Sequence, residues 1–393
     1  MGGERIGRRA ELTFRHNREH GRHGWLRLTP AYSVRVVRDL LDELPEGARV
    51  LDPFSGTGTT ALCAVERGLS GTGVELNPFL VWLARLKTRR FAKRTLARAA
   101  EAATEALEGL GEPVPAPPIH NVERWWAAPV LDWLCRLKGA LPTRGAHAEL
   151  LELAFCRTMI ALSGAAFDHP SMSFKEAKSH TDAQARARFE DDVRAVLEAA
   201  ATNPAGKARI VHGDARALPV GDVEFDAVIT SPPYPNRMSY VRELRPYMYW
   251  TGHLKVARDA GELDWDAIGG TWGVATSRLK HWERSRPRPR GLGKVLGEIR
   301  RASDKNGALL ANYVDRYFED IDQHLEALRP RVAAGGTLAY VIGNASFYGV
   351  LVPAEKLFES LMRRHGFHDA RSAILRKRNS KKELYELLVS ARG

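Results

Sequence analysis

The 393-residue sequence contains only three cysteines, and this scarcity narrows the classes of protein to which the chain can belong. Cys63, Cys135 and Cys156 are scattered, without the paired spacing of a disulfide framework or a zinc site. Each lies among apolar neighbours, so we expect buried thiols in a reducing compartment. The sequence predicts neither a disulfide nor a metal site.

Long apolar runs and a secretory leader are also lacking. No apolar stretch approaches the roughly 20 residues that cross a bilayer. The first 18 residues are too polar for a signal peptide. No internal repeat is visible either. We therefore predict a cytoplasmic protein with no membrane partner.

Acidic residues are outnumbered by basic ones. Lys and Arg total 59 against 47 Asp and Glu, which gives a formal charge of +12 and favours a polyanionic partner. Residues 1–28 form a basic N-terminal arm. This arm is either mobile and solvated or binds along the phosphates of a nucleic acid. At Thr29 and Pro30 the pattern changes to a helix N-cap with proline at its first position.

A strand, a small-residue loop and a helix follow one another over residues 50–67. Gly56 and Gly58 allow the loop backbone to approach a ligand, and the N–H groups at the helix start point towards it. A tight turn requires glycine for steric reasons alone. However, the next predicted strand, 71–76, ends near Glu75, where doubly wound folds place an acid on ribose hydroxyls. The pattern predicts a nucleotide-cofactor site.

Strands and helices alternate along most of the chain, which predicts an α/β sheet with helices on both faces. The polar turn 378–382 joins the last two strands as a β-hairpin, so the final strand should run antiparallel to its neighbours. We predict four regions: the arm 1–28, a cofactor-binding half 29–95, a helical insert 96–207 that could recognise the target, and a catalytic half 208–393. The seven predicted strands are 49–52, 71–76, 208–214, 226–230, 336–344, 370–377 and 384–391.

The tetrapeptide Ser231-Pro232-Pro233-Tyr234 follows directly on the apolar strand 226–230. Its two prolines remove two N–H donors and fix the directions of the carbonyls. The Pro232 carbonyl and the Ser231 hydroxyl can accept two N–H bonds from an amino group on a planar ring, and Tyr234 can stack on that ring. A Pro-Pro turn considered alone would not predict a binding site. This turn, however, follows a strand at the edge of the sheet where ligands bind.

Three segments together resemble the amino-methylating DNA methyltransferases that use S-adenosyl-L-methionine. They are Asp-Pro-Phe-Ser-Gly-Thr-Gly-Thr at 52–59, Glu-Leu-Asn-Pro at 75–78, and Thr-Ser-Pro-Pro-Tyr at 230–234. The serine-first tetrapeptide is similar to the cytosine-N4 branch. The resemblance implies a Rossmann-like, seven-stranded class I methyltransferase fold and double-stranded DNA as partner. A cognate restriction endonuclease and a place at a bacterial or archaeal nucleoid would accompany it.

The same resemblance implies the roles of individual residues. The amine would be activated by hydrogen bonds and take the methyl group by direct in-line attack on a flipped-out base. The catalytic residues would be Ser231, Pro232, Pro233 and Tyr234. The cofactor-binding residues would be Thr29, Pro30, Asp52, Phe54, Ser55, Gly56, Gly58, Thr59, Glu75, Asn77 and Asp214.

Two stretches downstream of the tetrapeptide could hold nucleic acid. In 236–250 arginines alternate with aromatic residues, and Arg237 and Tyr240 are our candidates. In 278–290 two prolines exclude a regular helix, so we predict a phosphate-binding loop rather than a merely solvated one. Its candidate residues are Arg278, Lys280, Arg284, Arg286, Arg288 and Arg290.

Two alternative functions stay open at this level. One keeps the reaction and changes the target, to the N6 amine of adenine in DNA or to an amine in RNA. The other is a non-catalytic nucleic-acid-binding protein on a vestigial methyltransferase fold. The intact glycine loop, Glu75 and the tetrapeptide favour an enzyme.

Overall fold

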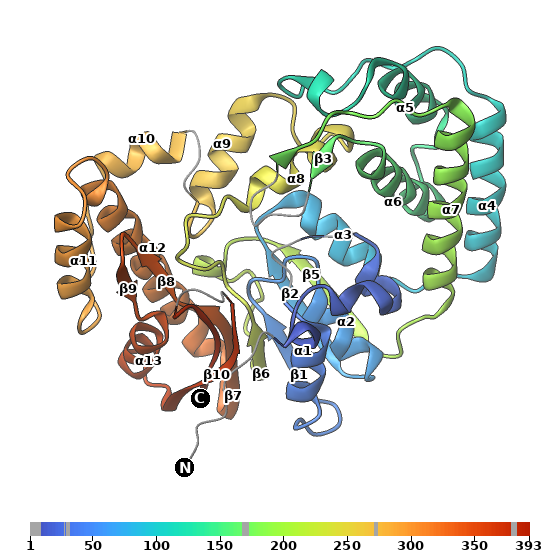
Figure 1. Cartoon of the computed structure of the whole chain (residues 1–393). Coiled ribbons are helices and arrows are strands. Elements are labelled where there is room, and N and C mark those ends of the chain that lie inside the picture. Colours follow the sequence, from blue (N-terminus) through green and yellow to red (C-terminus); the bar gives the residue numbers. More distant parts are fainter. Residues whose placement is uncertain (1–8, 27, 29–31, 167–172, 271–273, 379–382) are drawn as a thin grey trace.

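A computed structural model describes residues 9–26, 28, 32–166, 173–270, 274–378 and 383–393 of the chain (Figure 1). Its largest sheet has seven strands in the order β10-β11-β7-β6-β1-β2-β5. The strands are β1 (Arg49–Asp52), β2 (Ser70–Glu75), β5 (Lys207–His212), β6 (Phe225–Thr230), β7 (Val332–Gly343), β10 (His368–Lys377) and β11 (Tyr385–Arg392).

Neighbouring strands pair in parallel except at β11, which runs antiparallel to both β7 and β10. The predicted Rossmann-like sheet of seven strands with a closing hairpin is therefore confirmed. Predicted strand limits agree to within two residues except at the start of β7. That strand begins at Val332 because a register shift opposite Phe225 and Ala227 absorbs the additional residues. Two small sheets lie outside it, formed by β3 (Ala165–Ala166) with β4 (Ser173–Phe174) and by β8 (Ala345–Phe347) with β9 (Val350–Val352).

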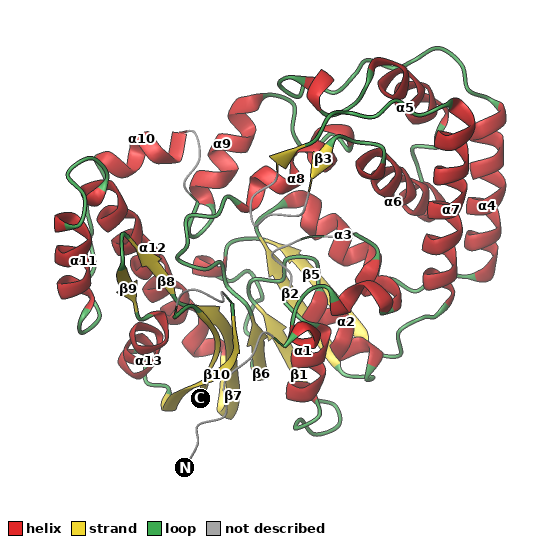
Figure 2. Ribbon diagram, in the orientation of Figure 1, coloured by secondary structure: helices red, strands yellow, loops and turns green. Residues whose placement is uncertain are grey.

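Alternating side chains of the central strands enter two separate hydrophobic clusters. In β1, Val50 belongs to one cluster and Leu51 to the other. In β6, Ile229 and Val228 divide in the same way. Successive strand residues point to opposite faces, so both faces of this sheet are buried. Helices cover both of them (Figure 2).

Most of the chain outside the sheet is helical. The predicted N-cap at Thr29 and Pro30 lies outside the described residues, and the helix that follows, α1, is capped by the Ser33 side chain. No described helix is both long and apolar enough to cross a membrane. The α-helices are α1 (Val34–Leu41), α2 (Thr59–Glu66), α3 (Pro78–Thr88), α4 (Lys93–Glu108), α5 (Ala128–Ala140), α6 (Ala146–Ala161), α7 (Asp182–Ala201), α8 (Tyr240–Trp250), α9 (Ala257–Asp266), α10 (Val274–Lys280), α11 (Leu292–Arg301), α12 (Gly307–Leu328) and α13 (Ala354–Arg364).

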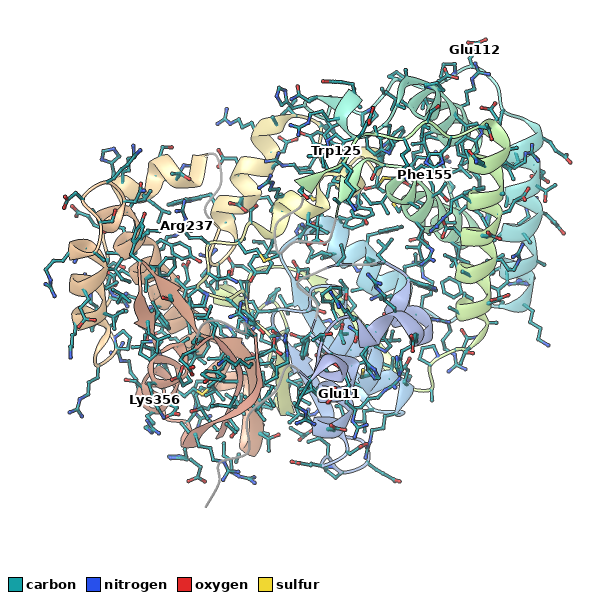
Figure 3. All side chains as sticks on the ribbon, in the orientation of Figure 1. Glu11, Glu112, Trp125, Phe155, Arg237 and Lys356 are labelled. Atoms are coloured by element: carbon teal, nitrogen blue, oxygen red, sulfur yellow. The ribbon has the colours of Figure 1, made fainter. Side chains whose placement is uncertain are left out.

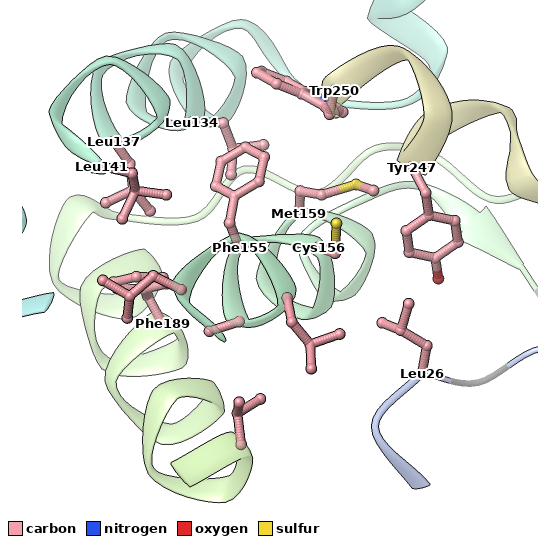
Figure 4. Packing of buried hydrophobic residues seen from close by; sticks show 14 of the residues in the cluster. Leu26, Leu134, Leu137, Leu141, Phe155, Cys156, Met159, Phe189, Tyr247 and Trp250 are labelled. Atoms are coloured by element: carbon pink, nitrogen blue, oxygen red, sulfur yellow. The ribbon is translucent and has the colours of Figure 1, made fainter. Parts of the chain in front are cut away.

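The insert between β2 and β5 forms a helical lobe, shown at the upper right of Figure 1. It begins with α4 at Lys93, three residues before the predicted boundary. Its core joins α8, because Phe155 packs edge-on against Trp250 (Figure 4). Trp126 packs edge-on against the same ring. All three cysteines are buried, as predicted, and Cys156 lies in this core. The lobe is therefore packed onto a helix that follows the tetrapeptide 231–234.

The described part of the N-terminal arm, residues 9–26, is folded, so its interpretation as a free arm is wrong. Its three short 3₁₀ helices are η1 (Ala10–Leu12), η2 (His16–Glu19) and η3 (Gly21–Gly24). Arg22 is 3% exposed, and its guanidinium donates to the carbonyls of Lys87 at 2.9 Å and Ala200 at 2.8 Å. Those carbonyls belong to the last turns of α3 and α7, where a cation is favourable. The positive charge of Arg22 therefore satisfies helix ends rather than phosphates. Arg15 and Arg18 are exposed, and a contact of these residues with phosphates stays a prediction.

We predict that Arg22→Ala lowers the free energy of unfolding by about 2–4 kcal/mol, because it leaves several buried carbonyls without a donor. Urea denaturation followed by circular dichroism measures the change. Arg18→Ala is the matched control, since Arg18 lies in the same segment and is exposed. Equal stability of the two variants would contradict this role of Arg22.

Candidate active site

A cavity lies at the carboxyl ends of β1, β2, β5 and β6, where open α/β sheets bind ligands. It is lined by the loop after β1, by the end of β2, by the loop after β5 and by the tetrapeptide after β6. Residues of α8 and of the segment 263–268 close it on the side of the helical lobe. The predicted site residues that line it are Phe54, Ser55, Gly56, Thr59, Glu75, Asn77, Asp214, Ser231, Pro233 and Tyr240.

Glu75 organises the glycine loop. One of its carboxylate oxygens accepts from the Gly56 amide at 2.8 Å, and the other accepts from the Asn77 amide at 2.8 Å. Gly56 adopts a φ of +51°, a conformation that favours glycine. Removal from water raises the pKa of Glu75 from its ordinary value of 4.5 to about 7, although both amide bonds oppose the shift. The loop is thereby held by an acid that titrates near neutral pH.

Asp52 supports the loops from behind, which corrects its prediction as a cofactor contact. It is fully buried, and its Oδ1 accepts from the Phe54 amide at 3.1 Å and from the Thr230 hydroxyl at 2.6 Å. The carboxylate thus links the ends of β1 and β6 directly beneath the two functional loops. Burial raises its pKa from 3.8 to about 6.

Gly58 also proves structural rather than a lining residue. Its φ is +79°, and a Cβ atom there would lie 2.8 Å from the Cβ of Ala84 in α3. Helices α2 and α3 can approach this closely only because position 58 carries no side chain. Gly58 therefore sets the position of the helix whose N-terminus faces the cavity.

Asp214 reaches the cavity with its charge already compensated. Arg216 donates to both of its carboxylate oxygens, at 3.1 and 2.7 Å, and also to Asp320 at 2.8 Å. The Arg216 guanidinium further donates to the Asp266 carbonyl in the segment that closes the cavity. This network fixes the loop after β5 and leaves Asp214 at the cavity wall as an oriented acceptor.

His324 of α12 is a residue that sequence reasoning missed. Its Nδ1 lies 3.0 Å from the Ala215 carbonyl and its Nε2 lies 2.7 Å from the Tyr340 hydroxyl. Because a carbonyl can only accept, Nδ1 carries the proton and Nε2 accepts from Tyr340. Burial lowers the pKa of His324 to about 4, which keeps the ring neutral. The ring also packs edge-on against Phe54, with 4.7 Å between the ring centroids. His324 therefore contacts both the loop after β1 and the loop after β5.

The tetrapeptide presents an acceptor to the cavity. Ser231 Oγ donates to the Val341 carbonyl at 2.9 Å, so its proton is committed and its lone pairs stay available. The Pro233 carbonyl is occupied by the Tyr317 hydroxyl at 2.7 Å. Pro232 is buried and does not line the cavity, although its carbonyl accepts no hydrogen bond from the described residues. Ser231 Oγ is therefore the acceptor that the tetrapeptide offers to the cavity, and the role of the Pro232 carbonyl stays a prediction.

Tyr234 is held by the C-terminal hairpin and does not line the cavity. Its hydroxyl donates to Glu386 at 2.9 Å, and the Arg378 guanidinium lies 5.0 Å from the ring centroid. A Cβ atom at Gly343 would lie 2.6 Å from the ring. A base can stack on this ring only after Arg378 moves, so the stacking role stays a prediction. Tyr240 does line the cavity, and its hydroxyl accepts from the Tyr234 amide at 2.8 Å.

The basic loop is largely tied to α12, which corrects its prediction as a phosphate-binding loop. Arg284 is only 5% exposed and pairs with Asp315 at 2.7 Å, and Arg288 pairs with the same carboxylate at 2.7 Å. Arg286 pairs with Asp322 at 2.8 Å and with Glu326 at 2.9 Å. Arg278 and Lys280 belong to α10, not to a loop, and Arg278 pairs with Glu262. Lys280 and Arg290 are exposed, and their nucleic-acid role stays a prediction.

A cluster of metal-ligand types lies away from the cavity, formed by His23, Cys63 and Glu66. The His23 Nε2 is 3.3 Å from Glu66 and 3.7 Å from the Cys63 sulfur. Arg38 already donates to the same Glu66 oxygen at 3.1 Å, and the buried Lys87 ammonium acts on both Cys63 and Glu66. Because these cations already supply positive charge, we assign no metal to the cluster.

Comparison with known proteins finds short sequence similarities. No protein-family model matches the chain. A 69-residue stretch is 33% identical to the Type II methyltransferase M.BsoBI of Geobacillus stearothermophilus, covering 17% of this chain and 14% of that protein. A 95-residue stretch is 26% identical to the Type II methyltransferase M.AvaI of Nostoc sp., covering 23% and 20%. The chain thus spans a small part of the length of these relatives.

Solved structures show only distant likeness. TrmN from Thermus thermophilus gives a TM-score of 0.34 at 13% identity, over 97% of this chain and 52% of that one. The rRNA methyltransferase AviRa from Streptomyces viridochromogenes gives 0.33 at 12% identity, over 92% and 86%. Nothing in the assignment of the site depends on these low scores.

We predict that Glu75 makes the stability of the ligand-free protein sensitive to pH. Its folded pKa lies above its unfolded value, so its favourable contribution is complete below pH 4.5 and is lost as the pH rises through 7. Relative to Glu75→Gln, the wild-type free energy of unfolding should fall between pH 5 and 8, by at most about 1.4 kcal/mol per pH unit.

Urea denaturation at several pH values measures this difference. Glu46→Gln is the matched control, because Glu46 is an exposed acid and its substitution should leave the pH profile unchanged. A wild-type-minus-Glu75→Gln difference that stays flat from pH 5 to 8 would contradict the desolvation of Glu75.

Proposed function

We propose that this protein is a DNA methyltransferase that transfers the methyl group of S-adenosyl-L-methionine to the exocyclic N4 amine of cytosine. One observation carries the proposal: a single cavity is lined both by the glycine loop with Glu75 and by Ser231 of the tetrapeptide. A cofactor and a target amine could therefore meet there at short range, as direct transfer requires. The short similarities to two Type II methyltransferases support the same substrate class.

The residues present fit the cofactor. Glu75 can accept bonds from ribose hydroxyls on lone pairs that the two amides leave free. Ser55 Oγ is buried without a hydrogen-bond partner among the described residues, and it lies against Gly73 of β2, where an added Cβ atom would be 2.3 Å away. Its contact with the cofactor therefore stays a prediction. Asp214 would contact the adenine from the loop after β5. Thr29 and Pro30 would close over the methionine moiety, although they lie outside the described residues.

The tetrapeptide would activate the amine. The lone pair of an exocyclic amine is delocalised into the ring, so the nitrogen is a poor nucleophile. Hydrogen bonds from its two N–H groups to Ser231 Oγ and the Pro232 carbonyl would favour a tetrahedral nitrogen and localise that lone pair. The cofactor would supply an electrophilic sulfonium methyl group, which the nitrogen would take in line as the carbon–sulfur bond breaks and the neutral thioether S-adenosyl-L-homocysteine leaves. The methylated nitrogen would then lose one of its protons. No covalent bond between the protein and the base is then needed.

The target base must leave the duplex to reach this cavity. Double-stranded DNA is the proposed partner, in agreement with the net charge of +12. A cognate restriction endonuclease, as accompanies many sequence-specific modification enzymes, would be a functional companion. The same acceptors would also suit the N6 amine of adenine, so the identity of the methylated base discriminates between the two targets.

We predict that Glu75→Ala weakens the binding of S-adenosyl-L-methionine by a factor of about 30 to 1,000, equivalent to about 2–4 kcal/mol for hydrogen bonds to a charged acceptor. Isothermal titration calorimetry measures the affinity, and Glu46→Ala is the control. Wild-type affinity in a folded Glu75→Ala protein would remove Glu75 from the cofactor site. Absence of cofactor binding by the wild type would favour the non-catalytic alternative.

Ser231→Ala should lower the methylation rate by about 10²–10³ while leaving cofactor affinity nearly unchanged. The Ser231 bond strengthens as the nitrogen becomes tetrahedral, so its loss acts on the chemical step. Single-turnover methyl transfer to duplex DNA at saturating cofactor measures the rate, and calorimetry on the same variant checks cofactor affinity. A wild-type rate in Ser231→Ala would overturn the catalytic assignment.

A further inference from the structure

The hairpin formed by β8 and β9 exposes a tyrosine at its tip. Tyr348 is 54% exposed and adopts a φ of +50°, a conformation that a bulky side chain rarely takes. Gly349 follows with a φ of +87°, which completes a two-residue turn. A turn of this kind normally uses Asn or Gly at both positions, so a large aromatic residue here carries a conformational cost. Such strain is concentrated at functional sites in proteins.

This hairpin is anchored to the catalytic loop. It leaves the sheet just after Gly343, the residue against which the Tyr234 ring packs. On its inner side, Phe347 packs edge-on against Tyr313 at 6.0 Å. The Tyr313 hydroxyl in turn accepts from the Arg237 amide at 3.0 Å, three residues beyond the tetrapeptide. The hairpin is therefore linked through Tyr313 to the segment that follows the tetrapeptide.

Positive charge surrounds the tip. Arg237 is exposed and, like Tyr348, adopts a positive φ, of +56° (Figure 3). The Asn306 amide donates to the Tyr348 hydroxyl at 3.2 Å and is the main cause that lowers the pKa of this phenol. The charges of Arg237 and Lys305 lower it further, which places both cations near the ring. Asp304 is the exposed acid beside Lys305 in the chain.

We infer that Tyr348 is a wedge that enters duplex DNA and fills the gap left by the flipped base. This inference rests on the proposed function and adds to it the element that opens the duplex. An exposed ring on a rigid two-residue turn can stack on the neighbouring bases, and stacking does not depend on sequence. Arg237 and Lys305 are placed to contact phosphates on either side of the opened step.

The wedge should matter only where a base pair must be broken. Tyr348→Ala should lower kcat/KM at least tenfold on native genomic DNA and less than twofold on the same DNA after heat denaturation. Tyr348→Phe should retain wild-type activity on both, because the ring is kept. Leu351→Ala is the matched control, since Leu351 is also exposed on this hairpin, at 44%, and lacks a ring. Transfer of a labelled methyl group measures all four proteins.

Each outcome decides one question. Equal loss on native and denatured DNA, or no loss on either, would overturn the wedge while leaving the methyltransferase proposal intact. Failure of the wild type to methylate any DNA would instead refute the proposed function. If the wild type methylates only duplex DNA, the denatured substrate is replaced by a duplex oligonucleotide that carries the mapped site. This oligonucleotide has an abasic position opposite the target base, so that no base pair has to be broken. On that oligonucleotide the kcat/KM of Tyr348→Ala, relative to the wild type, should be at least fivefold higher than on the fully paired duplex. A smaller gain would overturn the wedge.

Discussion

The hydrogen bond between Asp52 and Thr230, at 2.6 Å, is the contact on which the rest of the site depends. It joins the ends of two adjacent parallel strands, β1 and β6, from whose carboxyl ends the glycine loop and the tetrapeptide emerge. Asp52 also accepts from the Phe54 amide and so fixes the first turn of the glycine loop. A fully buried carboxylate thereby sets the distance between the proposed cofactor and target positions. Strand pairing alone would place the loops at one edge without fixing this detail.

Desolvation is the physical cost of this arrangement. Burial raises the pKa of both Asp52 and Glu75, to about 6 and about 7, although each accepts several hydrogen bonds. Burying these carboxylates lowers the stability of the ligand-free protein. Their electrostatic interactions with a ligand become stronger once that ligand excludes water. Neutral His324 and the compensated Asp214 hold neighbouring loops without adding net charge to the cavity. The ionisation of Asp52 and of Glu75 therefore couples the stability of the site to pH.

Local patterns allowed much of this structure to be predicted. Strand limits, the glycine loop and the convergence of Glu75 with Ser231 follow from short-range periodicity and from the geometry of parallel strands. The errors have a common cause, which is pairing over long sequence distances. Arg284 and Arg288 read as free charges until Asp315, about thirty residues later, is seen to neutralise them. Arg22 reads as part of a mobile arm until the carbonyl ends of two helices surround it, and His324 leaves no local signal in α12.

We propose that one cavity holds a sulfonium methyl group within reach of the N4 amine of cytosine. Incubation of the purified protein with isotopically labelled S-adenosyl-L-methionine and duplex DNA, with total RNA in parallel, tests it most directly. Mass spectrometry of the digested nucleosides identifies the product. We predict labelled N4-methylcytosine from DNA, absent with Ser231→Ala, and no labelled nucleoside from RNA. Label only in N6-methyladenine or in RNA would contradict the proposed target, and absence of label from every nucleoside would contradict the proposed activity itself.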